Sequence, residues 1–149
     1  MPEETLKITA DKFTFQIPKD LSYSDAGVWV KLEGARARVG LSDFAQQSSG
    51  DVAFVKIQRV GTALNRGDEL GEIETVKVNV RFPSPLKGEI VEVNPSLEEA
   101  AELVNQDPYG KGWLAVIELA DWESDRRGLL DAKSYSALVK GQAEAEMKK

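Results

Sequence analysis

The chain has 149 residues, of which 42% are hydrophobic and 30% charged, a composition typical of one folded domain and not of a disordered protein. Its net charge is −6 and no basic run is longer than two residues, which argues against phosphate-driven binding of nucleic acid. The absence of Cys and His excludes disulfides, zinc sites with thiolate or imidazole ligands, and catalytic pairs or triads that need an imidazole.

The same absences limit the class and location of the protein. General acid–base catalysis near neutral pH would require a strongly perturbed carboxylate or lysine, so we expect a non-catalytic protein. No N-terminal apolar stretch resembles a signal peptide, and no apolar run is long enough to cross a bilayer. We therefore expect a cytoplasmic protein that does not contact a membrane.

Short strands are predicted along most of the chain, because alternating or β-branched apolar segments recur between turns rich in Gly, Pro and Asn. The first strand lies inside an N-terminal extension, residues 1–22, and ends at Pro18. Many short strands joined by turns are typical of an antiparallel sandwich or flattened barrel. The predicted strands span residues 13–17, 29–32, 36–41, 52–57, 69–74, 78–82, 88–93 and 113–119.

Two short helical segments are predicted between these strands. Ser42 is the expected N-cap of a single helical turn over residues 43–47, since its hydroxyl suits a free backbone N–H. Ser96 to Glu99 form a capping box that predicts a second short helix. That helix is expected to stop before Asp107-Pro108.

The C-terminal part is predicted to be a helix docked on the sheets. Leu130, Ser134 and Leu138 recur at helical spacing on one face. Beyond them, residues 141–149 lose apolar side chains, so we expect them to fray. The whole chain, residues 1–149, is interpreted as a single domain that is mainly β with short helices.

Lys77 is the most informative residue, because it lies at the turn between two predicted strands and has valine on both sides. A lysine displayed at a tight turn is what a ligase needs to attach a prosthetic acid through an amide. The chemistry would then belong to the cofactor, and the protein would be its carrier. A plain surface lysine is the alternative, because exposed lysines in hairpins are common.

Four segments of the chain carry a family resemblance. They include Glu-Thr-Val-Lys at 74–77 and Asn-Gln-Asp-Pro-Tyr-Gly-Lys-Gly-Trp at 105–113, a highly specific combination. From Tyr23 to Leu138 the chain resembles the glycine cleavage H protein family of lipoyl carriers. Biotin is the alternative cofactor, but the lysine of that family normally lies between methionines. The matching segments span residues 39–46, 70–77, 84–94 and 103–114.

The resemblance implies two small antiparallel sheets related by quasi-symmetry, with the lysine at a hairpin tip. It implies lipoate in amide linkage to Lys77, acting as a swinging arm between active sites. Glu74 is implied to be recognised by a lipoyl ligase, the alternative being a solvent-exposed charge on a strand. Asn105, Asp107, Pro108 and Tyr109 would form a rigid turn beside the arm. Asn105 and Tyr109 are therefore candidates for the arm's cleft, with Tyr109 either packing or lining it.

One segment departs from the family pattern. Where glycine cleavage H proteins normally have His-Glu-Trp, this chain has Gly27-Val28-Trp29. In the family the His-Glu pair lines the cleft that holds the aminomethyl-loaded arm, so Gly27 and Val28 are candidate cleft residues. A valine neither accepts a hydrogen bond from an amine nor balances its charge. Either the loop has drifted and another carboxylate such as Asp25 compensates, or the cargo is different.

We favour a different cargo. The chain looks like the lipoate-binding proteins that serve heterodisulfide-reductase-like complexes in bacterial sulfur oxidation, where the dithiolane would hold sulfur intermediates. The alternative is a glycine cleavage carrier that works with glycine decarboxylase and aminomethyltransferase. Either carrier would need lipoate ligase or lipoyl-assembly enzymes, and dihydrolipoyl dehydrogenase, as partners. A third class, an unmodified structural or interaction domain, remains if no cofactor is attached.

Overall fold

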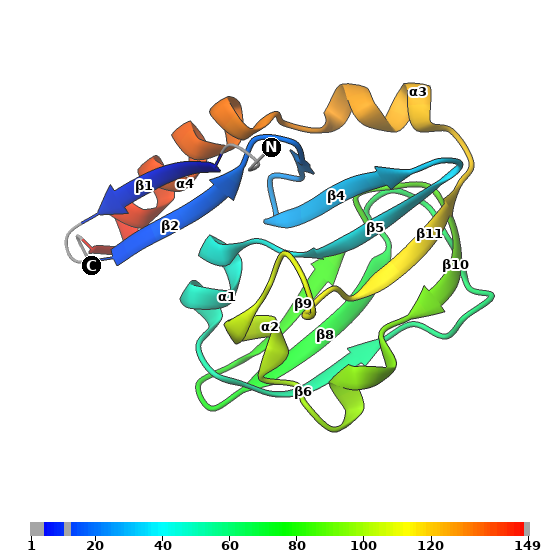
Figure 1. Cartoon of the computed structure of the whole chain (residues 1–149), viewed down its shortest axis with the longest axis horizontal. Helices are drawn as coiled ribbons and strands as arrows, with labels where there is room; N and C mark the ends of the chain where they lie inside the picture. Colours follow the sequence, from blue (N-terminus) through cyan, green and yellow to red (C-terminus); the bar gives the residue numbers. More distant parts are fainter. Residues whose placement is uncertain (1–4, 11–12, 148–149) are drawn as a thin grey trace.

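The computed structural model describes residues 5–10 and 13–147 (Figure 1). The other residues of the predicted extension and tail, 1–4, 11–12 and 148–149, lie outside the described part. Within it, strands pair antiparallel in a six-stranded sheet, a three-stranded sheet and a separate two-stranded hairpin. The prediction of a mainly β fold with short helices is confirmed.

The larger sheet has the strand order β3-β4-β5-β11-β10-β7. Its β4–β5 hairpin turns through Gly34-Ala35, and Gly34 has a φ of +69°, a left-handed conformation that suits glycine. β5 then pairs with β11, a strand far away in the sequence. The strands are β3 Ser22–Tyr23, β4 Val28–Glu33, β5 Arg36–Leu41, β7 Ala63–Leu64, β10 Gly88–Val93 and β11 Ala115–Leu119.

The smaller sheet has the order β6-β8-β9 and lies below the larger sheet in Figure 1. Its strands are β6 Val52–Ile57, β8 Glu69–Thr75 and β9 Asn79–Pro83. Leu70, Ile73 and Phe82 are buried, and they pack with side chains of the larger sheet in one hydrophobic cluster, the main cluster. The two sheets differ in strand number, so any symmetry between them is incomplete.

A second hydrophobic cluster joins the two ends of the chain. The N-terminal hairpin, made of β1 Thr5–Ala10 and β2 Phe13–Pro18, packs against helix α4, Ala132–Met147 (Figure 1). Tyr23 and Tyr135 stack in this cluster with ring centroids 4.5 Å apart. Its buried members are Phe15, Ile17, Leu21, Tyr23, Trp29, Phe44, Ala132, Tyr135, Val139 and Ala143.

Both ends of the chain are more ordered than the sequence predicted. The extension contains two strands instead of one; the alternation of Leu6 and Ile8, both half-buried, is the signal that reveals β1. At the other end, the residues expected to fray from 141 onward continue α4 to Met147. Ala143 is buried against the second cluster, which explains why the helix does not stop earlier.

The short helices follow their caps. Helix α1, Asp43–Ser49, begins after Ser42, whose Oγ accepts a hydrogen bond from the N–H of Ala45 at 3.1 Å, as predicted. The predicted capping box at Ser96 is wrong, because the turn begins one residue earlier and is capped by Asn94. Pro95 starts this 3-10 turn, since its fixed φ suits the first position of a helical turn. The remaining short elements are η1 Pro95–Glu98, α2 Leu103–Gln106, α3 Trp122–Asp125 and η2 Arg126–Gly128.

No helix in residues 5–10 and 13–147 has both the length and the apolar character that a bilayer crossing requires.

Candidate functional site

The loop that carries Lys77 is short and is held in shape by one side chain. It consists of Val76, Lys77 and Val78, between the end of β8 and the start of β9. The Oγ1 of Thr75 donates to the backbone oxygen of Val78 at 2.9 Å. The Oγ1 of Thr75 also accepts hydrogen bonds from the N–H groups of Lys77 at 3.2 Å and Val78 at 3.0 Å. The loop conformation is therefore set locally, by its own sequence.

Lys77 is exposed at the tip of this hairpin. Its neighbours do not anchor it in the core, since the side chains of Val76 and Val78 are 78% and 48% exposed. The aliphatic part of Lys77 lies over Gly50, where a Cβ atom would come within 3.6 Å of its Cδ. Gly50 ends α1 with a φ of +92°, a conformation that glycine adopts without steric cost.

Asn105 fixes the turn over which Lys77 lies. Its side-chain amide nitrogen donates to the backbone oxygen of Gly50 and to Oε1 of Gln46, both at 2.9 Å. Its Oδ1 accepts the N–H of Val52 at 2.8 Å. Asn105 thus ties α2 to the segment that connects α1 to β6, which contains the Gly50 turn under Lys77. Asn105 does not line the cavity described below.

Tyr109 is half-buried and packs against the second cluster, which is one of the two roles that the sequence left open. Its hydroxyl donates to the backbone oxygen of Gln16 at 2.6 Å and accepts the N–H of Asp43 at 3.0 Å. Burial raises the pKa of Tyr109 well above its ordinary value. Its ring lies 6.2 Å from that of Trp29, whose indole N–H donates to the backbone oxygen of Pro108 at 2.9 Å.

Glu74 lies on the outer face of the smaller sheet, directly before Thr75. Its carboxylate forms an ion pair with the ammonium group of Lys56 at 3.1 Å. The side chains are 31% and 67% exposed respectively, so the pair is accessible from outside and contributes little to stability. Its recognition by a ligase stays a prediction.

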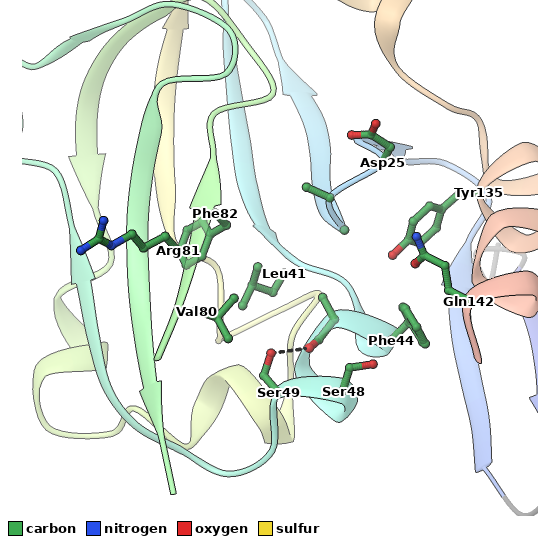
Figure 2. A pocket seen from close by; sticks show the side chains of 13 residues that line it. Asp25, Leu41, Phe44, Ser48, Ser49, Val80, Arg81, Phe82, Tyr135 and Gln142 are labelled. Carbon is green, nitrogen blue, oxygen red and sulfur yellow. Dashed lines mark hydrogen bonds between the residues drawn. The ribbon is translucent and has the colours of Figure 1, made fainter. Parts of the chain in front are cut away.

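A cavity of about 190 Å³ lies between the two clusters (Figure 2). Leu41, Val80 and Phe82 supply apolar walls on one side, and α1 and α4 close the other. Ser49, on its wall, directly precedes the glycine over which Lys77 lies. The lining residues are Asp25, Ala26, Gly27, Leu41, Phe44, Ala45, Ser48, Ser49, Val80, Arg81, Phe82, Tyr135 and Gln142.

Of the two residues that depart from the family pattern, only Gly27 lines this cavity. Gly27 has a φ of +90°, and a Cβ atom there would lie 2.9 Å from Cβ of Ala45 and 3.3 Å from the hydroxyl of Tyr135. Val28 is fully buried in the main cluster. The expectation that the side chain of Val28 faces the cleft is therefore not met.

Sequence reasoning missed most of the cavity, because its walls come from elements far apart in the chain. The clearest omission is Tyr135 of α4, whose hydroxyl lies 2.6 Å from Oγ of Ser42. Burial raises the pKa of Tyr135 to about 12, with the bond to Ser42 acting in the opposite direction. Asp25, suggested as a compensating carboxylate, is exposed and does line the cavity.

Comparison with known proteins identifies the family. Residues 21–142 match the family described as Glycine cleavage H-protein. The chain is 47% identical to the glycine cleavage system H protein of Bacteroides thetaiotaomicron, over 83% of this chain and 98% of that protein. It is 42% identical to that of Brevibacillus brevis, over 84% and 98%. The crystal structure of a glycine cleavage system H protein from Mycobacterium marinum superposes with a TM-score of 0.71, at 30% identity, over 81% of this chain and 97% of that one.

These relatives correct the predicted cargo. The preference for a sulfur-oxidation carrier is wrong, because relatives 39–47% identical to this chain are named glycine cleavage system H protein. The heterodisulfide-reductase-like partner has no support either. The physical reason for the error is the position of Val28: a side chain enclosed in the main cluster does not report on what the cavity holds.

The matched segment contains both the lysine hairpin and all the residues that line the cavity. Glycine cleavage H proteins are non-catalytic carriers that hold lipoate covalently on a lysine. Their partners are glycine decarboxylase, aminomethyltransferase, a lipoyl ligase and dihydrolipoyl dehydrogenase. With the match extending over more than half of its length, this chain belongs to the glycine cleavage H-protein family.

Proposed function

We propose that this chain is the lipoyl carrier of a glycine cleavage system and that Lys77 bears the lipoyl group. The observation that carries the proposal is the display of Lys77 at the tip of an exposed hairpin, with its stem over Gly50, the residue that follows Ser49 of the cavity wall. In this role a lipoate ligase or lipoyl-assembly enzymes load Lys77. The loaded protein then serves glycine decarboxylase, aminomethyltransferase and dihydrolipoyl dehydrogenase in turn.

The residues around Lys77 fit a lipoyl group. The hairpin leaves its ammonium group accessible to an acylating enzyme, and Thr75 keeps the loop in one conformation. Lys87 is the first alternative attachment site, and it is also exposed. Its backbone is held on both sides, however, by hydrogen bonds with Asp125 and Ala120, so it does not stand at a free tip.

When bound, lipoate would supply a reducible disulfide for a carried aminomethyl group. The chain's own residues orient the attachment point and exclude water. Gly50 lets the stem of Lys77 lie close to the end of α1. Leu41, Val80 and Phe82 offer an apolar surface of the kind that suits a hydrocarbon arm.

Asp25 supplies a negative charge on the cavity wall that suits an amine cargo. It is exposed and lines the cavity, whereas Val28, at the position of the family's glutamate, is enclosed in the main cluster. A carboxylate is a charge-assisted acceptor for an ammonium group. We therefore favour the interpretation in which the sequence has drifted at Gly27 and Val28 while the cargo is retained.

Two measurements test the proposal. After co-expression with a lipoate ligase, the intact mass should show one lipoyl addition that Lys77→Arg abolishes and Lys87→Arg leaves in place. The lipoylated protein should then support glycine decarboxylation and aminomethyl transfer at rates comparable to those of another H protein. An addition that persists in Lys77→Arg would refute the attachment site, and a lipoylated protein without turnover would refute the cargo.

A further inference from the structure

The N-terminal hairpin lies outside the part of the chain that matches the family. The match begins at residue 21, whereas β1 and β2 span residues 5–10 and 13–18. Even so, the hairpin is not a loose appendage within the described structure. Phe15 is 5% exposed and Ile17 is fully buried, so this segment contributes to the second cluster.

The hairpin packs behind both helices that close the cavity. The ring of Phe15 meets that of Phe44 edge to face, with centroids 5.0 Å apart, and Phe44 is one of the cavity's lining residues. β1 lies along α4, which contributes Tyr135 and Gln142 to the cavity (Figures 1 and 2). The hairpin is therefore in contact with the elements that form one wall of the cavity.

Hydrogen bonds fasten β2 to the beginning of α1. The N–H of Gln16 donates to a carboxylate oxygen of Asp43 at 2.9 Å. The backbone oxygen of Gln16 accepts the hydroxyl of Tyr109, which in turn accepts the N–H of Asp43. The side chain of Gln47 also donates to the backbone oxygen of Thr14 at 3.1 Å. Bonds that involve a carboxylate are stronger than neutral ones, so Asp43 is the firmest of these links.

The same network continues to the turn beneath Lys77. The other carboxylate oxygen of Asp43 accepts the side-chain amide of Gln46 at 2.8 Å. Gln46 accepts in turn from Asn105, which also holds the backbone oxygen of Gly50. A continuous series of hydrogen bonds therefore leads from the N-terminal hairpin to Gly50, over which the stem of Lys77 lies.

We propose that the N-terminal hairpin is a positioning element for the arm: by holding α1 it sets both the cavity wall at Phe44 and the Gly50 turn beneath Lys77. The part that concerns the arm rests on the proposed function. No residue of the hairpin lines the cavity. The hairpin acts indirectly, through α1, Tyr109 and Asn105. Its effect is to favour the arm's residence in the cavity over its exposure to solvent.

The first test uses the unmodified protein and does not depend on lipoate. Tyr109→Phe removes one of the links between β2 and α1, the hydroxyl that bonds Gln16 and Asp43, and keeps the ring in place. Amide hydrogen exchange at Gly50 and Val52 should accelerate by about tenfold, the equilibrium factor expected for one lost hydrogen bond. Phe13→Ala, on the exposed side of the same hairpin, is the matched control and should leave both amides unchanged.

Leu97→Ala separates positioning from general loss of stability. Leu97 is buried in the main cluster, away from the network, so this variant should be destabilised without a selective change at Gly50 and Val52. Equal exchange rates in Tyr109→Phe and the wild type would refute the proposal. So would acceleration of the same size in either control variant.

The second test uses protein lipoylated on Lys77. We would measure the rate at which a small phosphine reduces the dithiolane, since an arm held in the cavity is less accessible than one in solvent. Tyr109→Phe and Phe15→Ala should speed this reduction several-fold, and Phe13→Ala and Leu97→Ala should not. If the exchange rates change and the reduction rates do not, the hairpin fixes α1 without affecting the arm, and the proposal is refuted in that part. If Lys77 carries no lipoate, only the proposed function fails.

Discussion

The two hydrophobic clusters differ in how far apart in the sequence their members lie. The main cluster is built largely from hairpins whose strands follow one another, such as β4–β5 and β8–β9. The second cluster joins Phe15 to Ala143, from opposite ends of the chain. The cavity lies where they meet, because Leu41 and Phe82 belong to the main cluster and Tyr135 to the second. The lysine loop is therefore a local feature, whereas the cavity beside it depends on the whole fold.

The largest effect is expected at the boundary between the main cluster and the cavity. Val28→Glu would bury a carboxylate among apolar side chains, and should lower the free energy of unfolding by roughly 4 kcal/mol or more. Urea denaturation measures this loss. Ala26→Glu is the control, because Ala26 is exposed and should tolerate the same charge. If Val28→Glu lowers the free energy of unfolding no more than Ala26→Glu does, the side chain at position 28 faces the cavity and not the main cluster.

The second prediction asks whether the two clusters form one cooperative unit. Ile17→Ala in the second cluster and Ile73→Ala in the main cluster each remove a fully buried side chain, and each should cost about 2–5 kcal/mol. Tryptophan fluorescence and far-ultraviolet circular dichroism should report one shared transition in both variants. An early separate transition in Ile17→Ala alone would mean that the second cluster unfolds independently, against the single-domain interpretation.

High pH should destabilise the protein mainly through the buried tyrosines of the second cluster. Burial raises the pKa of Tyr135 from about 10 to about 12, so the unfolded state loses its phenolic proton first. The free energy of unfolding should therefore fall between about pH 10 and pH 12, by roughly 2–3 kcal/mol for this group. Tyr135→Phe should make the fall shallower in urea titrations at several pH values. Part of it should remain, since burial also raises the pKa of Tyr23 and Tyr109. If the free energy of unfolding falls equally steeply with pH in Tyr135→Phe and the wild type, burial does not raise the pKa of Tyr135 in solution.

The smallest effect is expected at the lysine itself. Lys77→Ala should change the free energy of unfolding by no more than about 0.5 kcal/mol, because the loop is closed by Thr75 and not by the lysine. Val76→Ala, on a neighbour that is also exposed, is the matched control. A loss above roughly 2 kcal/mol would make Lys77 a structural residue and would contradict its display at a free tip.

Prediction from sequence succeeded where short-range patterns decide the structure. Period-two alternation predicted most strands, and the serine cap predicted the start of α1. It failed at Ser96, because Pro95 started the turn one residue earlier, and at the C-terminal tail, where Ala143 packs on partners from the other end of the chain. The error over cargo has the same origin: the sequence shows that position 28 is valine, but not that its side chain faces the main cluster.

The sequence by itself determined the family, the antiparallel β class and the prominence of Lys77, because motif spacing, alternation and turn residues are local properties of the chain. Only the tertiary structure decided that Asn105 supports Gly50, that Tyr109 links α1 to an N-terminal hairpin, and that Tyr135 closes the cavity. These contacts join residues 55 to 93 positions apart, and such pairs are selected by the packing of the complete core.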